Sequence, residues 1–224
     1  HSVWFTPSVT GFLKGAPAEL YVEEHRGSFK MLEAVGPRCS STAMNIVYGD
    51  GSKARFQVAM EGPIDACSLG ASIEFEEPSP GHLRFVITSL GQDLAYFELT
   101  YDSPPNERFF GFGEQFSNLN HSGQTVPILS QEQGIGRGRP IVTDLMNTLS
   151  EGSGGGPYTT YCAMPQYVSN QNRSVMLENT EYSVFDLSDL ERVTIRVFDT
   201  DMTGRIFYGQ SYYELIERFS DYAG

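Results

Sequence analysis

The sequence predicts an all-β protein, an antiparallel β-sandwich that ends in one helix. Apolar and polar residues alternate with a period of two along much of the chain, which is typical of strands with one buried and one solvated face. Turn-forming Gly, Pro, Asn and Asp separate these short segments, and helical periodicity is clear only near the end. A sandwich of 224 residues can form as a single domain.

The alternating segments are the expected strands. In the segment 55–60, apolar Phe56, Val58 and Met60 alternate with polar side chains. The clearest segments of this kind are 55–60, 73–76, 83–88, 95–101 and 192–197. Just before the first of them, Asp50-Gly51 predicts a tight hairpin, because this dipeptide suits the positive φ angles of such turns.

The last segment is the one convincing helix. Ser211 and Glu214 form a capping box at its start. The apolar residues that then share one helical face are Tyr212, Leu215, Ile216, Phe219 and Ala223. We therefore expect residues 1–208 to form the sandwich and residues 209–224 to form a helix. Its apolar face must pack against its own domain or against something that follows.

The segment from Gln131 to Gly156 is different. Glycines are dense there and few strand patterns cover it, so we interpret it as a long loop, either functional or disordered. In its first part, residues 131–139, three glycines permit close approach of the backbone to a ligand. Arg137 and Arg139 offer planar donor groups for carboxylate, sulfonate or hydroxyl oxygens. A mobile surface loop fits this composition equally well.

The charge balance excludes two classes of partner. The chain has 15 basic and 28 acidic residues, a formal net charge of −13. It therefore lacks the basic stripe that nucleic acids need and is unsuited to an anionic membrane surface. No apolar run approaches the roughly 20 residues of a membrane-spanning helix. We expect neither nucleic acid nor membrane as a partner.

Cysteines and histidines predict neither a metal site nor a cofactor. The three cysteines lack C-x-x-C spacing and argue against a disulfide framework, but leave a single bridge open: Cys39, Cys67 and Cys162. The four histidines are scattered and form no ligand pair: His1, His25, His82 and His121.

No catalytic residue follows from the sequence. The G-x-S-x-G motif of serine hydrolases does not occur, and no helix pattern follows the glycines of 111–113, which favours a strand end with a bulge or tight turn. Glycoside hydrolysis needs two carboxyl groups at a defined separation. The candidates in the glycine-rich region are Glu114, Glu132 and Asp144, and we assign none of them as a catalytic pair.

An ordered set of motifs resembles glycoside hydrolase family 31. Residues 110–116, F-G-F-G-E-Q-F, resemble the Y/F-G-x-G-E motif of that family. Residues 130–137, S-Q-E-Q-G-I-G-R, resemble the S-E-Q-G-V-G-R loop of its sulfoquinovosidase-like branch, with one extra residue. Residues 154–158, 164–166 and 168–169 continue the similarity in order and spacing. The first hundred residues match only in strand character.

The resemblance implies a fold and a place in a larger enzyme. It implies a β-sandwich of galactose-mutarotase type, the N-terminal domain of a retaining α-glycosidase, with an α-glycoside as substrate. In that family a (β/α)8 barrel follows in the same polypeptide and carries the two catalytic aspartates. A barrel takes about 250 residues, so it is absent from this chain, and the helix of 209–224 would lead toward it. No catalytic residue is carried over.

The resemblance also implies a role for the glycine-rich loop. In such enzymes a sandwich loop leans over the mouth of the barrel and helps to wall the sugar pocket. The side chains that it places nearest the substrate are Glu132, Gln133 and Arg137. Arg139-Pro140 departs from the family pattern, so no role is carried over to Arg139.

Two other functions remain open. A free-standing carbohydrate-binding sandwich would stack sugars on tyrosines, such as Tyr158, Tyr161 and Tyr167, although tyrosines in strands more often pack in a core. A mutarotase acting alone would need a pair of acid/base side chains in a cleft, which the scattered histidines do not support.

Overall fold

A computed structural model describes residues 10–91 and 94–224. Within these residues the chain is mostly strand. The strands of the first part are β1 (Leu13–Ala16), β2 (Ala18–His25), β3 (Ser28–Val35), β4 (Cys39–Gly49), β5 (Lys53–Glu61), β6 (Ala71–Ser79), β7 (His82–Ser89) and β8 (Tyr96–Asp102). Those of the second part are β9 (Phe109–Gly113), β10 (Thr125–Ile128), β11 (Ala163–Ser169), β12 (Arg173–Leu177), β13 (Ser183–Asp186), β14 (Arg192–Val197) and β15 (Asp201–Tyr208).

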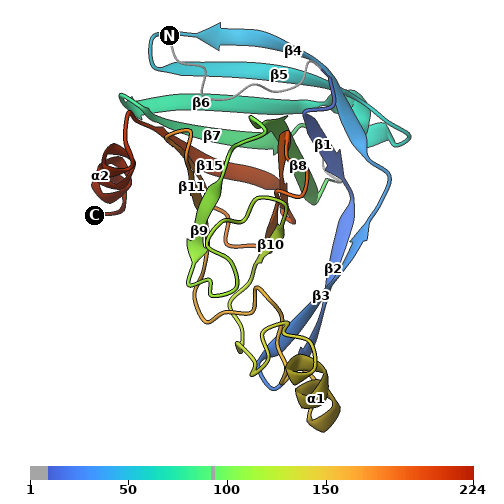
Figure 1. Ribbon diagram of the computed structural model, residues 1–224. Coiled ribbons are helices and arrows are strands. Elements are labelled where there is room, and N and C mark those ends of the chain that lie inside the picture. Colours follow the sequence, from blue (N-terminus) through green and yellow to red (C-terminus); the bar gives the residue numbers. More distant parts are fainter. Residues whose placement is uncertain (1–9, 92–93) are drawn as a thin grey trace.

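The strands form one large antiparallel sheet and one separate hairpin. The large sheet has the strand order β10-β13-β14-β8-β1-β4-β5-β6-β7-β15-β12-β11-β9. The hairpin β2–β3 pairs only with itself and projects away from strands β4 to β7 (Figure 1). The short helix η1 (Asp65–Leu69) joins β5 to β6, and the helices α1 (Val142–Leu149) and α2 (Tyr212–Ala223) complete the described elements.

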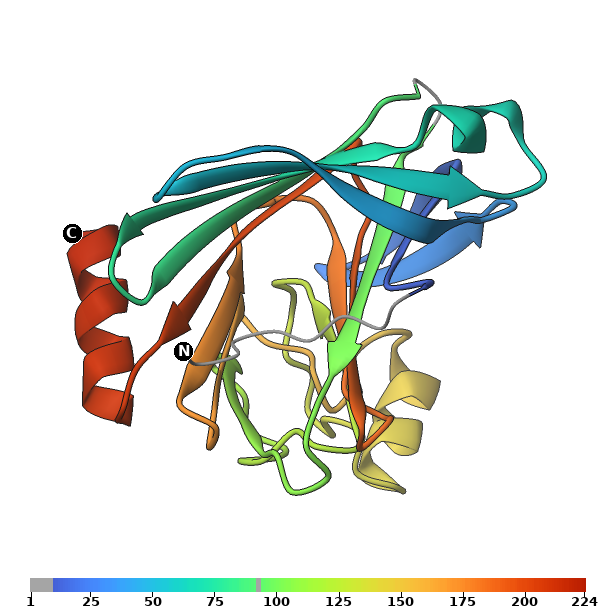
Figure 2. The same ribbon diagram turned by 90° about the horizontal axis from the view of Figure 1, so that it is seen from above.

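The large sheet folds over, so that its two ends face each other across the core (Figure 2). Phe112 on β9, at one edge, packs on Phe185 of β13, near the other edge, with ring centroids 5.1 Å apart. Tyr101 on β8 and Tyr167 on β11 also meet there, and their hydroxyl groups are hydrogen-bonded. One cluster of buried apolar residues fills the space between the two layers. This arrangement confirms the antiparallel sandwich.

Several local predictions are confirmed. Each of the five alternating segments lies mainly within a strand, from β5 to β14. The turn at Asp50-Gly51 joins β4 to β5, and the Asp50 N–H donates to the Lys53 carbonyl at 2.9 Å, although neither Asp50 nor Gly51 has a positive φ. Ser211 caps α2 by accepting from the Glu214 N–H at 3.4 Å. The Glu214 carboxylate accepts from the N–H of Gln210 rather than of Ser211.

The segment 131–156 is not wholly irregular, because α1 lies inside it. The sequence prediction missed this helix, and the reason is visible at its start: Ile141, the residue before it, has a positive φ and offers no side-chain cap. The usual start signal is therefore missing. The spacing of Ile141, Leu145 and Leu149, four residues apart, is the signal that could have indicated a helix. None of the residues of α1 is buried.

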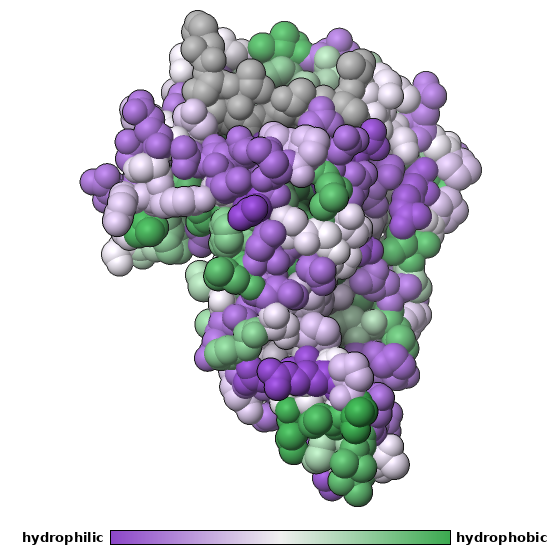
Figure 3. All heavy atoms as spheres, in the orientation of Figure 1, coloured by the Kyte–Doolittle hydropathy of each residue, from purple (hydrophilic) through white to green (hydrophobic). Residues whose placement is uncertain are grey.

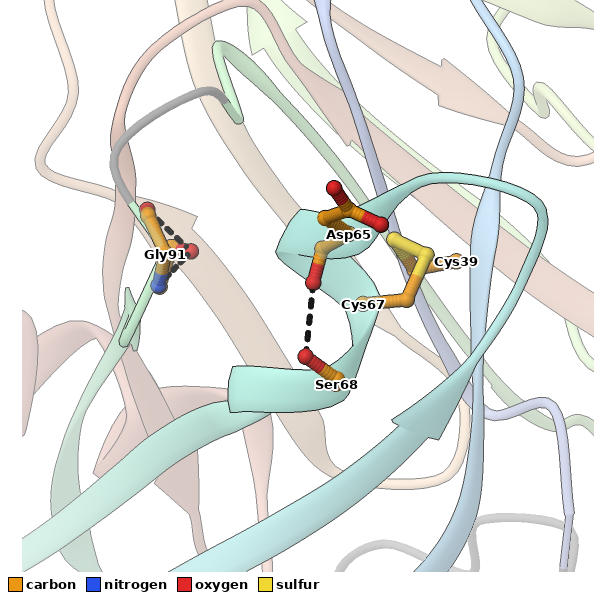
Figure 4. Close-up of a disulfide and its surroundings, with 6 residues drawn as sticks. Cys39, Asp65, Cys67, Ser68 and Gly91 are labelled. Atoms are coloured by element: carbon orange, nitrogen blue, oxygen red, sulfur yellow. Dashed lines mark hydrogen bonds between the residues drawn. A yellow bond between two sulfur atoms is a disulfide. The ribbon is translucent and has the colours of Figure 1, made fainter.

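One disulfide forms, the single bridge that the sequence left open. Cys39 at the start of β4 bonds to Cys67 in η1, with Cα atoms 5.2 Å apart (Figure 4). Both cysteines are buried, whereas Cys162 is free and exposed. The bridge holds η1, whose turn is supported by a hydrogen bond from Ser68 to the Asp65 carbonyl, against the start of β4.

A buried ion pair lies beside the two tyrosines that join the layers. The Nε of Arg173, at the start of β12, donates to Glu107 Oε1 at 2.8 Å, and its Nη2 contacts Oε2. Ser103 donates to the same carboxylate at 2.8 Å. The Glu107 side chain has no exposed surface, so its charge depends on these partners.

Helix α2 packs against the strands β7, β12 and β15 with one face only. Leu215 is 1% exposed among Phe207 and Met176, whereas Ile216 is 58% exposed. A polar cluster completes the contact: Glu178 accepts hydrogen bonds from Arg84, Arg205 and Tyr222. His82 Nε2 lies 2.8 Å from Nη1 of Arg205.

None of the described helices is long and apolar enough to cross a membrane.

Removing one member of the buried ion pair should destabilise the fold. Glu107→Leu leaves the Arg173 guanidinium buried without its carboxylate, so we expect the free energy of unfolding to fall by about 3–5 kcal/mol. The double variant Glu107→Leu/Arg173→Met removes both charges and should recover much of that loss. Urea denaturation of the three chains tests this, and a double variant less stable than Glu107→Leu would contradict it.

Acid should destabilise the chain through its buried histidines. Burial first, and then the Arg205 guanidinium, lower the pKa of His82, although Glu178 opposes this; burial also lowers the pKa of His121. The unfolded chain therefore binds more protons below about pH 6.5, so stability is present above this pH and is lost as the pH falls toward the lowered pKa values. We expect the urea midpoint to drop between pH 7.5 and 5.5, and to drop less in His82→Gln. An equal drop in both proteins would exclude His82 as a cause.

Candidate functional site

The glycine-rich loop, residues 131–139, belongs to a long excursion between β10 and β11 that is closed at its base. Ser130 and Thr160 form an isolated bridge, and the Gln131 N–H donates to the Thr160 carbonyl at 2.7 Å. Within the excursion, the N–H groups of Gly136 and Arg137 both donate to the Gly154 carbonyl at 2.8 Å. The loop is therefore hydrogen-bonded along its backbone rather than free.

Glu132 is an exposed side chain on this backbone. Its N–H donates to the Gly27 carbonyl at 2.9 Å, and its Oε2 accepts from the hydroxyl of Tyr161 at 2.7 Å. That hydrogen bond and the carboxylate charge raise the pKa of Tyr161. The carboxylate is thus held at one point, while the side chain lines an open groove.

Gln133 and Arg137 contribute in different ways. The Gln133 carbonyl accepts from Thr159 Oγ1 at 2.6 Å, which ties the loop to the chain that returns to β11. The Arg137 guanidinium lies 4.3 Å from the centroid of the Phe116 ring. It forms no ion pair within residues 10–91 and 94–224, neither with Glu132 nor with Asp144. A cation–π contact takes its place.

These side chains form one surface, which we call the loop face: Phe116, Glu132, Arg137 and Tyr161. Arg137 is close enough to Tyr161 for its charge to oppose the effect of Glu132 on the tyrosine pKa. Phe116 and Tyr161 are both exposed. The sequence analysis did not assign Phe116 to a site, although the aromatic residue that closes the 110–116 motif was a usable signal.

An open groove of about 450 Å³ adjoins the loop face. Glu132, Gln133 and Tyr161 line one side of it, and His25 and Arg26 at the end of the β2–β3 hairpin line another. A groove of this size is within the range of small-molecule sites, about 300–1,000 Å³. Arg139 is exposed, is not among the lining residues, and donates its N–H to the Gly136 carbonyl.

The side chains that a carbohydrate-binding module or a mutarotase would use do not gather at one site. Of the three tyrosines, Tyr161 is 59% exposed, whereas Tyr158 (9%) and Tyr167 (0%) belong to the core. His82 and His121 are buried in different parts of the fold, and His1 lies outside the described residues. No group of three His, Cys, Asp or Glu side chains among the residues described is placed to hold a metal ion.

Comparison with known proteins places this site in a family. The model described as "Glycosyl hydrolase 31 N-terminal galactose mutarotase-like domain" matches residues 68–186, from η1 to the end of β13. The chain belongs to this family. The match spans the 110–116 motif and the whole excursion with the loop face, which confirms the resemblance drawn from the motifs.

Curated relatives of this glycosyl hydrolase 31 domain are named sulfoquinovosidases. The chain is 29% identical to one from Escherichia coli (strain K12) over 156 residues, 70% of the chain and 23% of that protein. It is 25% identical to one from Agrobacterium fabrum over 138 residues, 62% of the chain and 21% of that protein. The chain thus spans less than a quarter of the length of these relatives.

A solved structure has the same fold over nearly the whole chain. It is described as a GH31 family sulfoquinovosidase from E. rectale in complex with the aza-sugar inhibitor IFGSQ. The TM-score is 0.82 at 21% identity, and the match covers 95% of this chain and 30% of that one. The described residues before the motifs, 10–91 and 94–100, therefore share the fold as well.

The contact between Phe116 and Arg137 should be measurable in the domain itself. We expect Arg137→Ala and Phe116→Leu each to lower the free energy of unfolding by about 1 kcal/mol or less, since Phe116 is exposed and Arg137 is only half-buried. In a double-mutant cycle by urea denaturation the two changes should couple by about 0.5–1 kcal/mol. Arg139→Ala with Phe116→Leu is the control pair, which should be additive. Additivity in both pairs would mean that the stack does not persist in solution.

Proposed function

We propose that this glycosyl hydrolase 31 domain is the N-terminal part of a retaining α-glycosidase and that its loop face walls the sugar pocket of a (β/α)8 barrel in the same polypeptide. Residues 209–224 then lead from the sandwich toward the barrel. Family membership supports the proposal, and so do the relatives, whose chains are several times longer than the matched part.

The observation that carries the proposal is the combination of a held backbone with exposed side chains on the loop face. The backbone of residues 131–137 is hydrogen-bonded within the excursion and to the hairpin, whereas Glu132, Phe116 and Tyr161 remain exposed. A pre-organised backbone lowers the entropy lost when a ligand binds. Aromatic faces suit the apolar faces of sugars, and carboxylate and guanidinium groups suit their hydroxyl groups.

The relatives support a proposal for the substrate class. Two of them are named sulfoquinovosidases, and the solved structure of that name holds an aza-sugar inhibitor. We therefore take an α-linked sulfoquinovoside as the first substrate to test and an α-glucoside as the second. Catalysis would come from two carboxyl groups of the barrel, because the oxocarbenium-like transition state needs both an acid and a nucleophile.

Two exposed apolar faces support the proposal that a partner domain packs against this one. The exposed residues of α1 and its flanks gather at one end of the molecule, a compact hydrophobic area in Figure 3: Ile141, Val142, Leu145 and Leu149. On α2, Tyr213 and Ile216 are exposed while Leu215 is buried. Contiguous apolar surface is typical of interaction sites. Both faces would be covered by a barrel that packs against the loop face and follows α2.

A free-standing carbohydrate-binding module is the second candidate. The exposed rings of Tyr161 and Phe116 favour it, since they could stack on a sugar without a barrel. Titration of the 224-residue chain with glycans separates the two proposals. Measurable binding by this chain alone favours the binding module, and no binding favours a pocket that needs the barrel.

In the barrel-bearing enzyme, Arg137→Ala should damage catalysis more than folding. A charge-assisted hydrogen bond from its guanidinium to substrate contributes about 1.5–3 kcal/mol, so kcat/KM should fall roughly ten- to hundredfold. Arg137→Lys should rescue little, because it lacks the planar donor group. Hydrolysis of aryl α-glycosides together with thermal denaturation gives both readouts.

The 224-residue chain serves as the control and should show no turnover. A large fall in melting temperature with near-normal kcat/KM would make Arg137 a structural residue only. Robust turnover by the short chain would contradict the requirement for a barrel.

A further inference from the structure

The β2–β3 hairpin is anchored at its base but has little support along its length. At the base, Gly36 N–H donates to the Pro17 carbonyl at 2.8 Å, and Leu20 and Val35 pack on a small core of Tyr96 and Phe198. Further out, residues such as Tyr21, Val22 and Leu32 are exposed. A two-stranded hairpin alone is marginally stable in water, so a second attachment is needed to order its far end.

That attachment is the glycine-rich excursion. We call residues 24–29 the hairpin tip. Phe29 N–H donates to Gln131 Oε1 at 2.9 Å, and the Gly27 carbonyl accepts from the Glu132 N–H at 2.9 Å. On the other side of the tip, Ser28 Oγ donates to the Gly152 carbonyl and Arg26 to Ser150 Oγ, both at 3.2 Å. Segments more than a hundred residues apart in the sequence thus share four hydrogen bonds. Figure 1 shows the end of the hairpin beside the excursion that holds α1.

Glycines make the close approach sterically feasible. Gly27 has φ +79°, and a Cβ at this position would lie 2.8 Å from Cγ of Glu132. Gly152 has φ +77°, and a Cβ there would lie 2.8 Å from Cβ of Ser28. Each segment therefore presents a glycine to the other, and any side chain at Gly27 would displace Glu132 directly.

We propose that the hairpin tip positions the loop face for substrate binding, with Gly27 and Gln131 as positioning residues for Glu132. The inference rests on the proposed function, because it assumes that Glu132 faces the sugar. Glu132 is held at two points: its N–H donates to the Gly27 carbonyl, and its carboxylate accepts from the Tyr161 hydroxyl. The contact between the tip and the loop also forms the groove, since its walls come from the tip and from the loop.

The test compares two glycines with the same backbone conformation. Gly27→Ala introduces the strain of a positive φ and the collision with Glu132. Gly123→Ala introduces the same strain at φ +78° in the turn before β10, where a Cβ would meet no atom within 4 Å. Hydrogen exchange in the 224-residue chain should show faster exchange of the Glu132 amide in Gly27→Ala, by about threefold or more, the size of one net hydrogen bond. Gly123→Ala should leave that amide unchanged.

A second pair keeps the inference testable if Gly27→Ala fails to fold. Gln131→Met keeps the side-chain length and removes the oxygen that accepts from Phe29, whereas Gln131→Glu keeps an acceptor oxygen. We expect the Phe29 and Glu132 amides to exchange about three- to tenfold faster in Gln131→Met and near the parent rate in Gln131→Glu. Unchanged exchange of both amides in Gln131→Met would overturn the inference.

Kinetics of the barrel-bearing enzyme distinguish this inference from the proposed function. Gln131→Met should raise KM for an aryl α-sulfoquinovoside about three- to tenfold with little change in kcat, because it loosens a group that binds ground state and transition state alike. Gln131→Glu should restore KM, which a loss of general stability would not do. A loosened loop with unchanged KM would leave the tip–loop contact standing but overturn the role of the loop in the sugar pocket.

Discussion

The whole molecule depends on the closure of one thirteen-stranded sheet over its own apolar face. An open sheet of this width exposes too much apolar surface, so it folds into two layers. Closure is held by two contacts between strands far apart in the sheet, Phe112 on Phe185 and Tyr101 on Tyr167. The buried pair of Arg173 on β12 with Glu107, in the connection from β8 to β9, adds to them. These contacts combine the packing of aromatic rings with a buried ion pair, and together they favour one relative position of the two layers.

Closure also creates the site. It brings the end of β10 close to the start of β11, where the bridge between Ser130 and Thr160 closes the excursion at its base. The chain between them cannot bury a core of its own, and its backbone polar groups need partners. It finds them within itself and in the hairpin tip, so two segments that lack independent stability become ordered together. The exposed side chains of Glu132 and Tyr161 then stand on a fixed backbone.

The domain offers groups that suit the recognition of a sugar. The loop face supplies rings, one carboxylate and one guanidinium beside an open groove. In the proposed function the chemistry comes from a barrel, and a rigid sandwich is a suitable platform for a loop that reaches over it. Under that proposal the barrel would also cover the exposed apolar face of α1, on a chain that carries a strong net negative charge.

The sequence by itself determined the sandwich, most strand positions, the α2 cap and the family, because alternation, turn residues and local motifs are short-range signals. It also placed Glu132 and Arg137 in one loop. It gave only a weak signal for α1, the four-residue spacing of Ile141, Leu145 and Leu149 without a cap, and it left the pairing of Cys39 with Cys67 open. Only the tertiary structure decided that Phe116 stacks on Arg137 and that Gly27 supports Glu132, because these contacts join segments that meet only after the sheet has closed.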